Sequence, residues 1–385
     1  MRVAINVKYF SPRGGAQTYI AYLAGCLLDA GHEVDVFAME RDPAFRCSAF
    51  HKVAASAFPK LLRDYSFAAA SAKALKDSDY DVIFADQKAF FVDVVRLGGG
   101  VWRQYMEREL QSLKGYPLSF LSAAKRRLSV KERLNLEIER RLYACPRLKR
   151  VIVNSACTKE ALLKDYDLPP DNIRVVYNGV NLARYNPARR MELRGEARRA
   201  LGLAEDDYVL LLLAMNFRLK GLLPLLEAVA KVRGEIAPRK VRLLAVGKKR
   251  AGFHAARARS LGLADSVQFL GPTKKPEECL AAADVLAHPT YHDPCANVCL
   301  EAMACGMPVV TTRANGASEL IADGDSGYVI VHASEISALA DRLAKLSDDG
   351  LRLRMGEAAR RGVERLTPER NMKQVIEIFQ EIVGG

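Results

Sequence analysis

Short apolar runs alternate along most of the chain with longer segments whose apolar residues recur periodically. The runs that predict strands are Val3–Val7, Val34–Ala38, Asp81–Ala85, Val151–Ser155, Tyr208–Leu213, Val241–Val246, Val267–Leu270, Val285–His288 and Val309–Thr311. Near-continuous apolar runs of this kind are typical of parallel strands that are buried on both faces. Strands that alternate with helices indicate βα units, so the sequence predicts an α/β protein.

Segments in which apolar residues recur every three or four positions predict the helices. They are Thr18–Ala30, Arg103–Tyr143, Leu223–Val232, Ala251–Leu261 and Pro368–Val383. A chain of 385 residues exceeds the usual domain of roughly 100–200 residues, so two domains are expected. The turn-rich stretch Leu168–Asn172 is the expected boundary. We therefore expect one domain over residues 1–169 and a second over residues 170–367.

The net charge of +13 is concentrated in one part of the chain. Residues 101–150 carry 13 Lys/Arg and 5 Asp/Glu, a local excess of +8. Such an excess suits an anionic partner, namely a membrane surface, a phosphorylated glycan or nucleic acid, and it equally suits a solvated helical face. Lys125, Arg126 and Arg127 stand among apolar neighbours, which favours contact with an anionic membrane surface. No recognition motif for nucleic acid accompanies the charge, so that partner is not expected.

Sequence composition also bears on cellular location and on metal binding. Residues 2–7 are too short for a signal-peptide core, and no run approaches 18 consecutive apolar residues. The scattered cysteines are typical of reduced, buried thiols, so a cytoplasmic protein is expected. His288, His292, Cys295, Cys299 and Cys305 offer ligand types for zinc, but their spacing matches no standard site. We expect neither a metal nor a cofactor.

Two adjacent glycines, Gly14 and Gly15, follow the first predicted strand. Doubly wound sheets bind ligands at such loops, at the carboxyl ends of their strands. A plain tight turn would have the same sequence. The pair lacks the spaced glycines of GxGxxG, which argues against a nicotinamide-dependent dehydrogenase.

The segment from His288 to Val310 carries the most chemical information. A strand and a loop precede Asp293-Pro294, and proline suits the first turn of a helix, which is expected to run to Cys305. Glu301 then lies eight residues beyond Asp293, roughly 12 Å along a helix. A helix amino end attracts phosphate, and the small Ala296 would let a ligand approach the backbone. A diphosphate there would leave Glu301 placed to accept hydrogen bonds from a ribose.

The donor-binding backbone of this helix start is expected at Ala296, Asn297 and Val298. Either carboxylate alone has an ordinary explanation, Asp293 as a helix cap and Glu301 as an exposed helical residue. The combination is the informative feature.

Asp293-x7-Glu301, followed by Ala-Met-Ala-Cys-Gly-Met-Pro, resembles the E-x7-E signature of retaining glycosyltransferases of family 4. Those enzymes have the GT-B fold, in which two Rossmann-like domains face each other across a cleft. Further features fall where the family has matching ones: Gly14-Gly15, Asn154-Ser155, Tyr177–Asn181, Lys220-Gly221, Val246-Gly247 and Gly316-x2-Glu319. Lys8–Phe10 and Asn216–Gly221 are most similar to the lipopolysaccharide-core glucosyltransferases within it.

The resemblance implies a role for several residues on the donor side. Glu301 would hold the donor ribose, and Asp293 replaces the family's first Glu beside the transferred sugar. Lys220, with Arg218, would neutralise the diphosphate leaving group, a large term in such transfers. Gly14 and Gly15 would let backbone approach the sugar or the phosphates.

On the acceptor side the chain departs from the family. The Gly98–Trp102 stretch stands where relatives carry an Asp or His that faces the acceptor. Asp93 lies nearby in the sequence, and Gly99 and Trp102 are the other candidates. Trp102 could stack on an acceptor sugar, or be an ordinary buried aromatic residue.

The resemblance implies a metal-independent transfer of a hexose, with glucose from UDP as the expected donor. The expected acceptor is a lipid-linked or lipopolysaccharide-core glycan, used by a peripheral protein on the inner face of the cytoplasmic membrane. The helix over residues 368–385 is expected to pack back on the first domain. Two alternatives stay open: a nucleotide-sugar epimerase, which needs carboxylates placed for proton transfer, and a non-catalytic GT-B protein that binds nucleotide or membrane.

Overall fold

The computed structural model describes residues 1–11, 14–56, 62–86, 88–117, 119–247 and 252–384. The chain forms two compact units. Unit 1 comprises Met1–Met106, Leu118–Tyr177 and Glu369–Gly385. Unit 2 comprises Glu107–Pro117 and Asn178–Pro368.

Unit 1 is built on a parallel sheet of seven strands in the order β5-β3-β1-β6-β7-β8-β9. The strands are β1 (Arg2–Asn6), β3 (Glu33–Ala38), β5 (Ala49–Lys52), β6 (Val82–Asp86), β7 (Val94–Leu97), β8 (Arg150–Val153) and β9 (Ile173–Val175). Short strands β2 (Tyr9–Phe10) and β4 (Glu40–Arg41) pair separately. The chain order reverses between β1 and β6, and ligands of such sheets bind at the carboxyl ends of the strands there.

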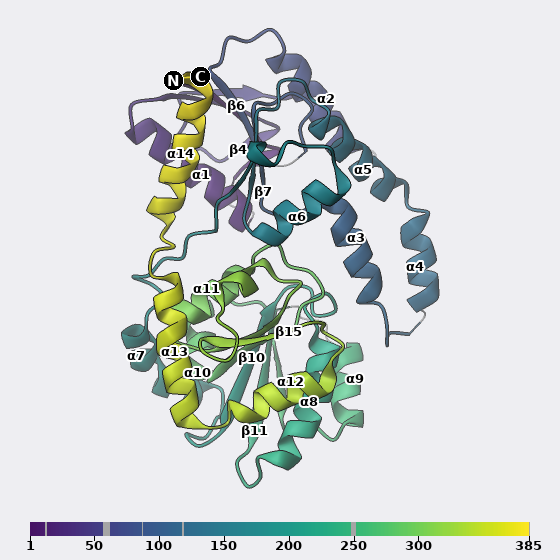
Figure 1. Cartoon of the computed structure of the whole chain (residues 1–385), viewed down its shortest axis with the longest axis vertical. Helices are drawn as coiled ribbons and strands as arrows, with labels where there is room; N and C mark the ends of the chain where they lie inside the picture. The colour runs from purple at the N-terminus through teal and green to yellow at the C-terminus, as the bar shows by residue number, and fades with distance from the viewer. Residues whose placement is uncertain (12–13, 57–61, 87, 118, 248–251, 385) are drawn as a thin grey trace. The chain divides into compact units, whose positions relative to one another are not determined.

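Helices pack on both faces of this sheet (Figure 1). They are α1 (Gly15–Asp29), α2 (Arg63–Leu75), α5 (Val130–Tyr143), α6 (Ala156–Asp165) and α14 (Pro368–Gly384), with a short 3₁₀ turn η1 (Pro170–Asn172). Helix α3 (Trp102–Gln111) begins in unit 1 and ends in unit 2, and α4 (Ser119–Arg127) projects from unit 1. The C-terminal helix α14 lies beside α1 and shares its hydrophobic core. The rings of Phe379 in α14 and Phe84 in β6 are 5.5 Å apart between centroids. The last helix of the chain is therefore part of unit 1.

Unit 2 has a parallel six-stranded sheet in the order β12-β11-β10-β13-β14-β15. Its strands are β10 (Tyr208–Ala214), β11 (Val241–Gly247), β12 (Val267–Leu270), β13 (Val285–His288), β14 (Val309–Thr312) and β15 (Gly327–Ile330). Its helices are α7 (Pro187–Ala200), α8 (Leu222–Glu235), α9 (Gly252–Ser260), α10 (Pro276–Ala282), α11 (Asn297–Ala304), α12 (Ile336–Lys345) and α13 (Asp349–Val363), with the 3₁₀ turn η2 (Gly316–Leu320). The order reverses between β10 and β13, which sets the ligand region of this unit.

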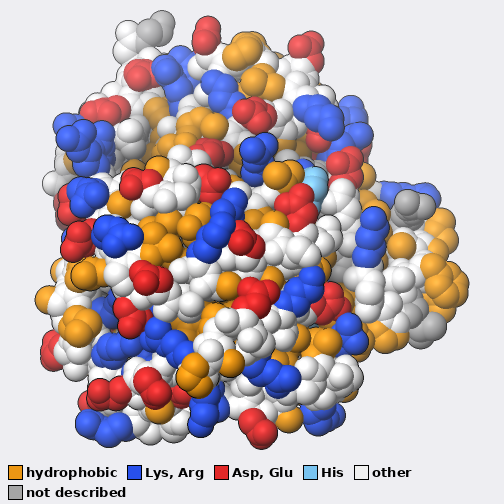
Figure 2. Space-filling view, turned by 60° about the horizontal axis from the view of Figure 1, so that its bottom comes forward, with side chains coloured by type: hydrophobic (Ala, Val, Ile, Leu, Met, Phe, Trp, Pro, Cys, Tyr) orange, Lys and Arg blue, Asp and Glu red, His pale blue; other side chains and the backbone are white. Residues whose placement is uncertain are grey.

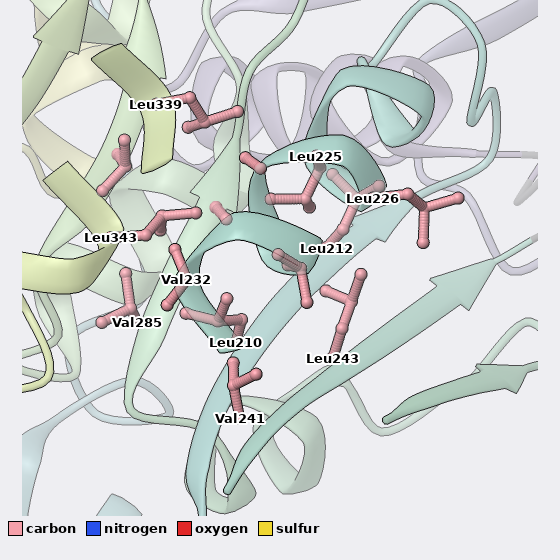
Figure 3. Close-up of a cluster of buried hydrophobic side chains, with 14 of the residues drawn as sticks. Leu210, Leu212, Leu225, Leu226, Val232, Val241, Leu243, Val285, Leu339 and Leu343 are labelled. Atoms are coloured by element: carbon pink, nitrogen blue, oxygen red, sulfur yellow. The ribbon is translucent and has the colours of Figure 1, made fainter. Parts of the chain in front are cut away.

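In the core of unit 2, α8 covers one face of the sheet. In Figure 3, Leu225, Leu226 and Val232 of α8 point toward Leu210 and Leu212 of β10. All five side chains are fully buried. Burial of one such aliphatic side chain contributes about 1.5–3 kcal/mol, so the packing holds the strand ends that carry the loops of the site.

In unit 1 the structure differs from the sequence-based expectation in the helices after residue 102 and in the boundary of the unit. The single helical stretch expected over Arg103–Tyr143 is three helices, because Gly115 adopts a left-handed φ of 82° and Pro117 follows it. Ser129 in extended conformation then precedes α5. The first unit also runs to Tyr177 instead of residue 169, because β9 pairs with β8 and completes the first sheet.

Candidate functional site

The loop after β10 places Lys220 at the carboxyl edge of the second sheet. Gly221, which follows it, has a φ of 75°, and a Cβ atom there would lie 1.9 Å from the Pro289 carbonyl oxygen. Only glycine therefore allows this close approach. The Tyr291 amide donates to the Leu219 carbonyl at 2.9 Å and ties the same two loops together. The loops after β10 and β13 thus meet at the point where the strand order reverses.

Lys220 and Asp293 form a largely buried ion pair between these loops. The ammonium Nζ donates to Asp293 Oδ2 at 2.6 Å and to the His292 carbonyl at 2.8 Å. The two side chains are 18% and 16% exposed. Burial alone would raise the pKa of the Asp293 carboxyl, but the charge of Lys220 and the nearby His288 side chain outweigh it and hold that pKa well below its usual range.

Two histidines surround the ion pair. His288 Nε2 lies 3.4 Å from Asp293 Oδ2, and burial lowers the pKa of His288. Burial and the nearby charge of Lys220 lower the pKa of His292 to about 4. Both rings are therefore neutral near pH 7, and Lys220 carries the positive charge beside Asp293.

The helix expected to begin at Pro294 begins three residues later, and Asp293 is not its cap. The Asp293 amide donates to the Ala314 carbonyl at 2.9 Å, and Asp293 forms a β-bridge with Asn315. The Asn315 side-chain oxygen also accepts the amide of Ala296 at 3.1 Å. This amide is therefore not available to a phosphate, and α11 offers the amides of Asn297 and Val298 at its first turn.

Arg218 is paired with an acidic residue of α3. Its guanidinium donates to Glu109 Oε1 at 2.7 Å, and Glu109 is buried. The same segment of unit 2 is anchored by Tyr116, whose hydroxyl lies 2.8 Å from His254 Nε2. Both cations that were expected at a diphosphate, Lys220 and Arg218, thus already contact carboxylates.

Glu301 of α11 lines a pocket of about 240 Å³ in unit 2. The pocket is also lined by Gly179, Val180, Asn181, Arg184, Tyr185, Asn297, Leu300 and Pro368. Burial raises the pKa of Glu301 to about 7, although Arg184 and a hydrogen bond from Tyr185 oppose the rise. A carboxylate with this environment accepts hydrogen bonds from ligand hydroxyls readily, because they replace the water it has lost.

The first glycine loop opens α1 in unit 1. A Cβ atom at Gly15 would meet nothing within 4 Å, and one at Gly14 would meet only the Gln17 side chain at 3.4 Å. The fold itself therefore does not require glycine there. The space around this backbone is open to a ligand.

A polar pocket of about 400 Å³ lies at the reversal point of the first sheet, and we call it the polar pocket. It is lined by Asn6, Val7, Lys8, Tyr9, Ala16, Gln17, Ile20, Asp64, Phe67, Asp86, Lys88, Gly98 and Gly99. Lys8 and Lys88 both donate to the Asp64 carboxylate. Burial works against ionisation, yet the two hydrogen bonds lower the pKa of Asp64 to about 2. Asp86, the other carboxylate of the lining, is paired with Arg96 at 3.3 Å. With Asp86 balanced in this way, the two lysines on Asp64 leave one positive charge in excess.

The candidate acceptor-side residues separate in the structure. Asp93 is buried at the amino end of β7, where it accepts from the Ile83 amide at 2.8 Å and from Arg147 at 2.9 Å. It stabilises the fold at the edge opposite the strand carboxyl ends, so its expected place in the acceptor site is wrong. Gly99 is exposed and lines the polar pocket. Trp102 is half-buried and lines an adjoining cavity.

The basic cluster on α4 also divides. Lys125 is exposed, whereas Arg126 donates to the buried carboxylate of Glu132 at 2.6 Å and is not directed to solvent. The side chain of Arg127 lies outside the described part of the structure. Large apolar side chains are exposed beside them: Phe120, Leu121, Leu128 and Val130, which we call the α4 patch. Figure 2 shows hydrophobic side chains gathered on the part that projects at the right, where α4 lies.

The described residues contain neither a membrane-spanning helix nor a cluster of metal ligands. Within the ranges given above, none of the helices has the length and apolar character needed to cross a membrane. In the same ranges, no three His, Cys, Asp or Glu side chains are gathered so that they could hold a metal ion.

Several residues of these sites were not predicted from the sequence. Asn315, Arg184 and Tyr185 belong to loops with no motif of their own. Asp64 and Lys88 come together only through the fold, so no sequence motif marks them. Lys88 is a non-glycine residue with a positive φ of 34°, which is a structural sign of a functional position.

Comparisons with known proteins place these features in a family. The family model "Glycosyltransferase Family 4" matches residues 13–184, and "Glycosyl transferases group 1" matches residues 194–362. A D-inositol 3-phosphate glycosyltransferase of Corynebacterium aurimucosum is 36% identical over 220 residues, which are 54% of this chain and 51% of that relative. The chain thus spans about half the length of this curated relative.

Solved structures resemble the whole chain at low identity. WaaG, a glycosyltransferase involved in lipopolysaccharide biosynthesis, matches 98% of this chain and 99% of its own with a TM-score of 0.79 and 23% identity. The Anabaena protein Alr3699/HepE, in complex with UDP-glucose, matches 99% of this chain and 100% of its own with a TM-score of 0.71 and 21% identity. These likenesses confirm the expected α/β GT-B fold with two parallel-sheet, Rossmann-like domains. The two family matches cover both halves of the chain, which belongs to the GT-B glycosyltransferases of family 4.

Proposed function

We propose that the chain transfers a hexose, with retention of configuration and without a metal ion, from a UDP-sugar to a lipid-linked glycan. The observation that carries the proposal is the Lys220–Asp293 pair at the reversal point of the second sheet. The carboxylate suits the sugar of a glycosyl diphosphate and the cation suits its diphosphate leaving group, and the two side chains are 2.6 Å apart.

Lys220 is the residue we assign to the leaving group. An ammonium has three protons, and two of them are directed to Asp293 and to the His292 carbonyl. The third is available to a phosphate oxygen, which would gain negative charge as the glycosidic bond breaks. Cations placed in advance at developing charge are worth several kcal/mol to such reactions. Arg218 would join only by sharing its guanidinium with Glu109.

We assign the ribose to Glu301 and the sugar to Asp293. Glu301 lines a pocket with the size and polar side chains for a nucleoside part, and its carboxylate would accept from vicinal hydroxyls. Asp293 accepts from Lys220 with Oδ2, so its other oxygen is the one proposed for a sugar hydroxyl. UDP-glucose is the proposed donor, and the UDP-glucose complex of the similar Anabaena protein supports it.

We place the acceptor on unit 1, at the polar pocket beside Gly99. Its net positive charge and exposed edge suit a hydroxylated, anionic glycan. The likeness to WaaG supports a lipopolysaccharide-type acceptor, whereas the curated relative's name points to a phosphorylated inositol. Both acceptors are polyols that carry a phosphate nearby, and the two lysines of the polar pocket would bind that phosphate.

We propose a peripheral location on the inner face of the cytoplasmic membrane, with the α4 patch as the contact. The four apolar side chains are accompanied by the exposed cations Lys125, Lys131 and Arg133. Apolar side chains bury in the acyl boundary while cations attract anionic lipid, by about 1 kcal/mol for each Lys or Arg.

Donor turnover tests the function directly. In a screen of UDP-, GDP- and ADP-sugars for slow hydrolysis, we expect UDP-glucose to release nucleotide fastest, and the released glucose to form first as the α anomer in NMR spectra. Excess EDTA should leave the rate unchanged. Loss of activity in EDTA that Mn²⁺ restores would contradict the metal-independent mechanism, and sugar epimerisation without net UDP release would favour the epimerase.

The raised pKa of Glu301 predicts how nucleoside affinity changes with pH. The ionised carboxylate is the binding form, so affinity is full above the pKa of about 7 and is lost as pH falls through it. Uridine, which does not titrate between pH 6 and pH 8, should bind up to about 10-fold more weakly at pH 6 than at pH 8 by calorimetry. Glu301→Gln should bind weakly at both values. If uridine affinity changed with pH equally in the variant and the wild type, Glu301 would not be the ribose-binding residue.

The α4 patch predicts binding to anionic vesicles. Replacing Phe120 and Leu128, which are 70% and 71% exposed, with Ser should lower pelleting with phosphatidylglycerol vesicles by about 10-fold, because both lose their apolar contact. The matched control is Met191→Ser with Leu353→Ser, which removes side chains that are 66% and 67% exposed in unit 2. Equal pelleting of the two double variants would contradict the assignment.

A further inference from the structure

An apolar cavity of about 310 Å³ lies beside the carboxyl end of β7, between α3 and α5 of unit 1. We call it the aromatic cavity. Its apolar walls are Leu97, Trp102, Tyr105, Ile138, Leu142 and Tyr143. The volume and the predominance of apolar and aromatic walls are those of small-molecule sites.

Two polar atoms in the walls of the aromatic cavity lack partners. Asn135 and Tyr143 are 4% and 9% exposed, and both line the cavity. Among the residues the structure describes, none forms a hydrogen bond with Asn135 Nδ2 or with the Tyr143 hydroxyl. Buried polar atoms in folded proteins nearly always have a partner, so these two indicate a molecule that enters the cavity.

Hydrogen bonds to two carboxylates hold the aromatic wall in place, and one of these carboxylates, Glu139, also lines the cavity. The Trp102 indole N–H donates to Glu132 at 2.9 Å, and the Trp102 amide donates to Glu139 at 2.6 Å. Tyr166 donates to the other oxygen of Glu139 at 2.8 Å. A wall fixed by three hydrogen bonds is organised before a ligand arrives, which is the property expected of a binding site.

The aromatic cavity adjoins the polar pocket through two shared residues, Lys88 and Gly99. Lys88 Nζ lies 5.7 Å from the centroid of the Trp102 ring and also donates to Asp64. Its φ of 34° is a strained backbone conformation, of the kind that persists at binding sites. One charged side chain thus separates a polar compartment from an apolar one.

We propose that the aromatic cavity binds an apolar group attached directly to the sugar or cyclitol that accepts the transferred hexose. This rests on the proposed function, in which unit 1 presents the acceptor. The hydroxylated ring occupies the polar pocket, the apolar group occupies the aromatic cavity, and Asn135 and Tyr143 donate to the oxygen that links them. The acceptor is an amphiphile whose apolar part begins one bond from its ring, and a free cyclitol phosphate would leave the cavity without its ligand.

The test compares three β-glucosides that share a ring and differ in the attached group. Methyl, phenyl and octyl glucoside, the last below its micelle concentration, are titrated into the full chain by calorimetry. We expect octyl or phenyl glucoside to bind at least 10-fold more tightly than methyl glucoside, and the better of the two identifies an alkyl or an aromatic group. Equal affinities, or no binding of any of them, would overturn the proposal.

Two tyrosine variants separate a ligand contact from a structural one. Tyr143→Phe removes a hydroxyl that has no partner in the described structure, so its melting temperature should not fall, whereas its affinity for the preferred glucoside should fall about 5-fold. Tyr166→Phe, on a ring 4.4 Å away, loses its bond to Glu139 and should melt lower while it keeps that affinity. Unchanged affinity in Tyr143→Phe would mean that the Tyr143 hydroxyl bonds to water and not to the ligand, which would contradict the proposed contact.

Hydrolysis of UDP-glucose by the same preparation distinguishes the two levels of the account. Turnover of UDP-glucose with equal affinities for the three glucosides would contradict the inference about the aromatic cavity but would still support the proposed function. A marked preference for an apolar glucoside, without turnover or binding of any nucleotide-sugar, would support the proposed ligand class of the aromatic cavity and contradict the proposed function.

Discussion

The Lys220–Asp293 ion pair is the interaction on which the candidate donor site depends. A largely buried pair is stable only when its geometry is good, because both ions have lost most of their water. Gly221 provides that geometry, since it lets the loop after β10 approach the Pro289 carbonyl. Neutral His288 and His292 leave the positive charge on Lys220 alone. Removal of one partner would strand the other charge, at a cost of about 3–5 kcal/mol.

The same arrangement appears in each unit at the point where its strand order reverses. In unit 2 the reversal between β10 and β13 gathers Lys220 and Asp293, and in unit 1 the reversal between β1 and β6 gathers Lys8, Asp64 and Lys88. One lysine contacts the carboxylate in unit 2 and two contact the carboxylate in unit 1, so in both clusters the charges are held in position without a ligand. Cations that are already held in position need not be gathered when a ligand arrives, which favours the binding of anions.

Patterning predicted most strands and the informative segment, because buried parallel strands are apolar without interruption. It did not predict β7, whose run is interrupted by Arg96, nor the late start of α11, which Asn315 sets from another loop. Residue type identified Lys220 and Glu301 as candidates, but not the carboxylates that Lys220 and Arg218 contact. Those contacts join residues 73 and 109 positions apart, and no local signal in one sequence reports them.

The aromatic cavity shows the same limit from another direction. Trp102 was recognisable as the single tryptophan beside a glycine loop, with stacking or burial both open. In the structure its N–H is bonded inward to Glu132 while its ring lines a cavity, and stacking on an acceptor sugar stays a prediction. The sequence alone grouped Asp93 with Trp102 as an acceptor-side candidate, whereas in the fold Asp93 lies at the opposite edge of the sheet.

The turnover of Lys220→Met is the measurement that tests the central claim most directly. With UDP-glucose as donor, its kcat should fall about 100- to 1,000-fold while uridine affinity stays within 3-fold, because the leaving group loses its cation and the nucleoside pocket keeps Glu301. Lys231→Met, an exposed lysine of the same unit that contacts Ser337, should match the wild type. Lys220→Met with Asp293→Asn removes both charges and checks that a folded site still lacks activity. A kcat for Lys220→Met within 3-fold of the wild type would contradict the account.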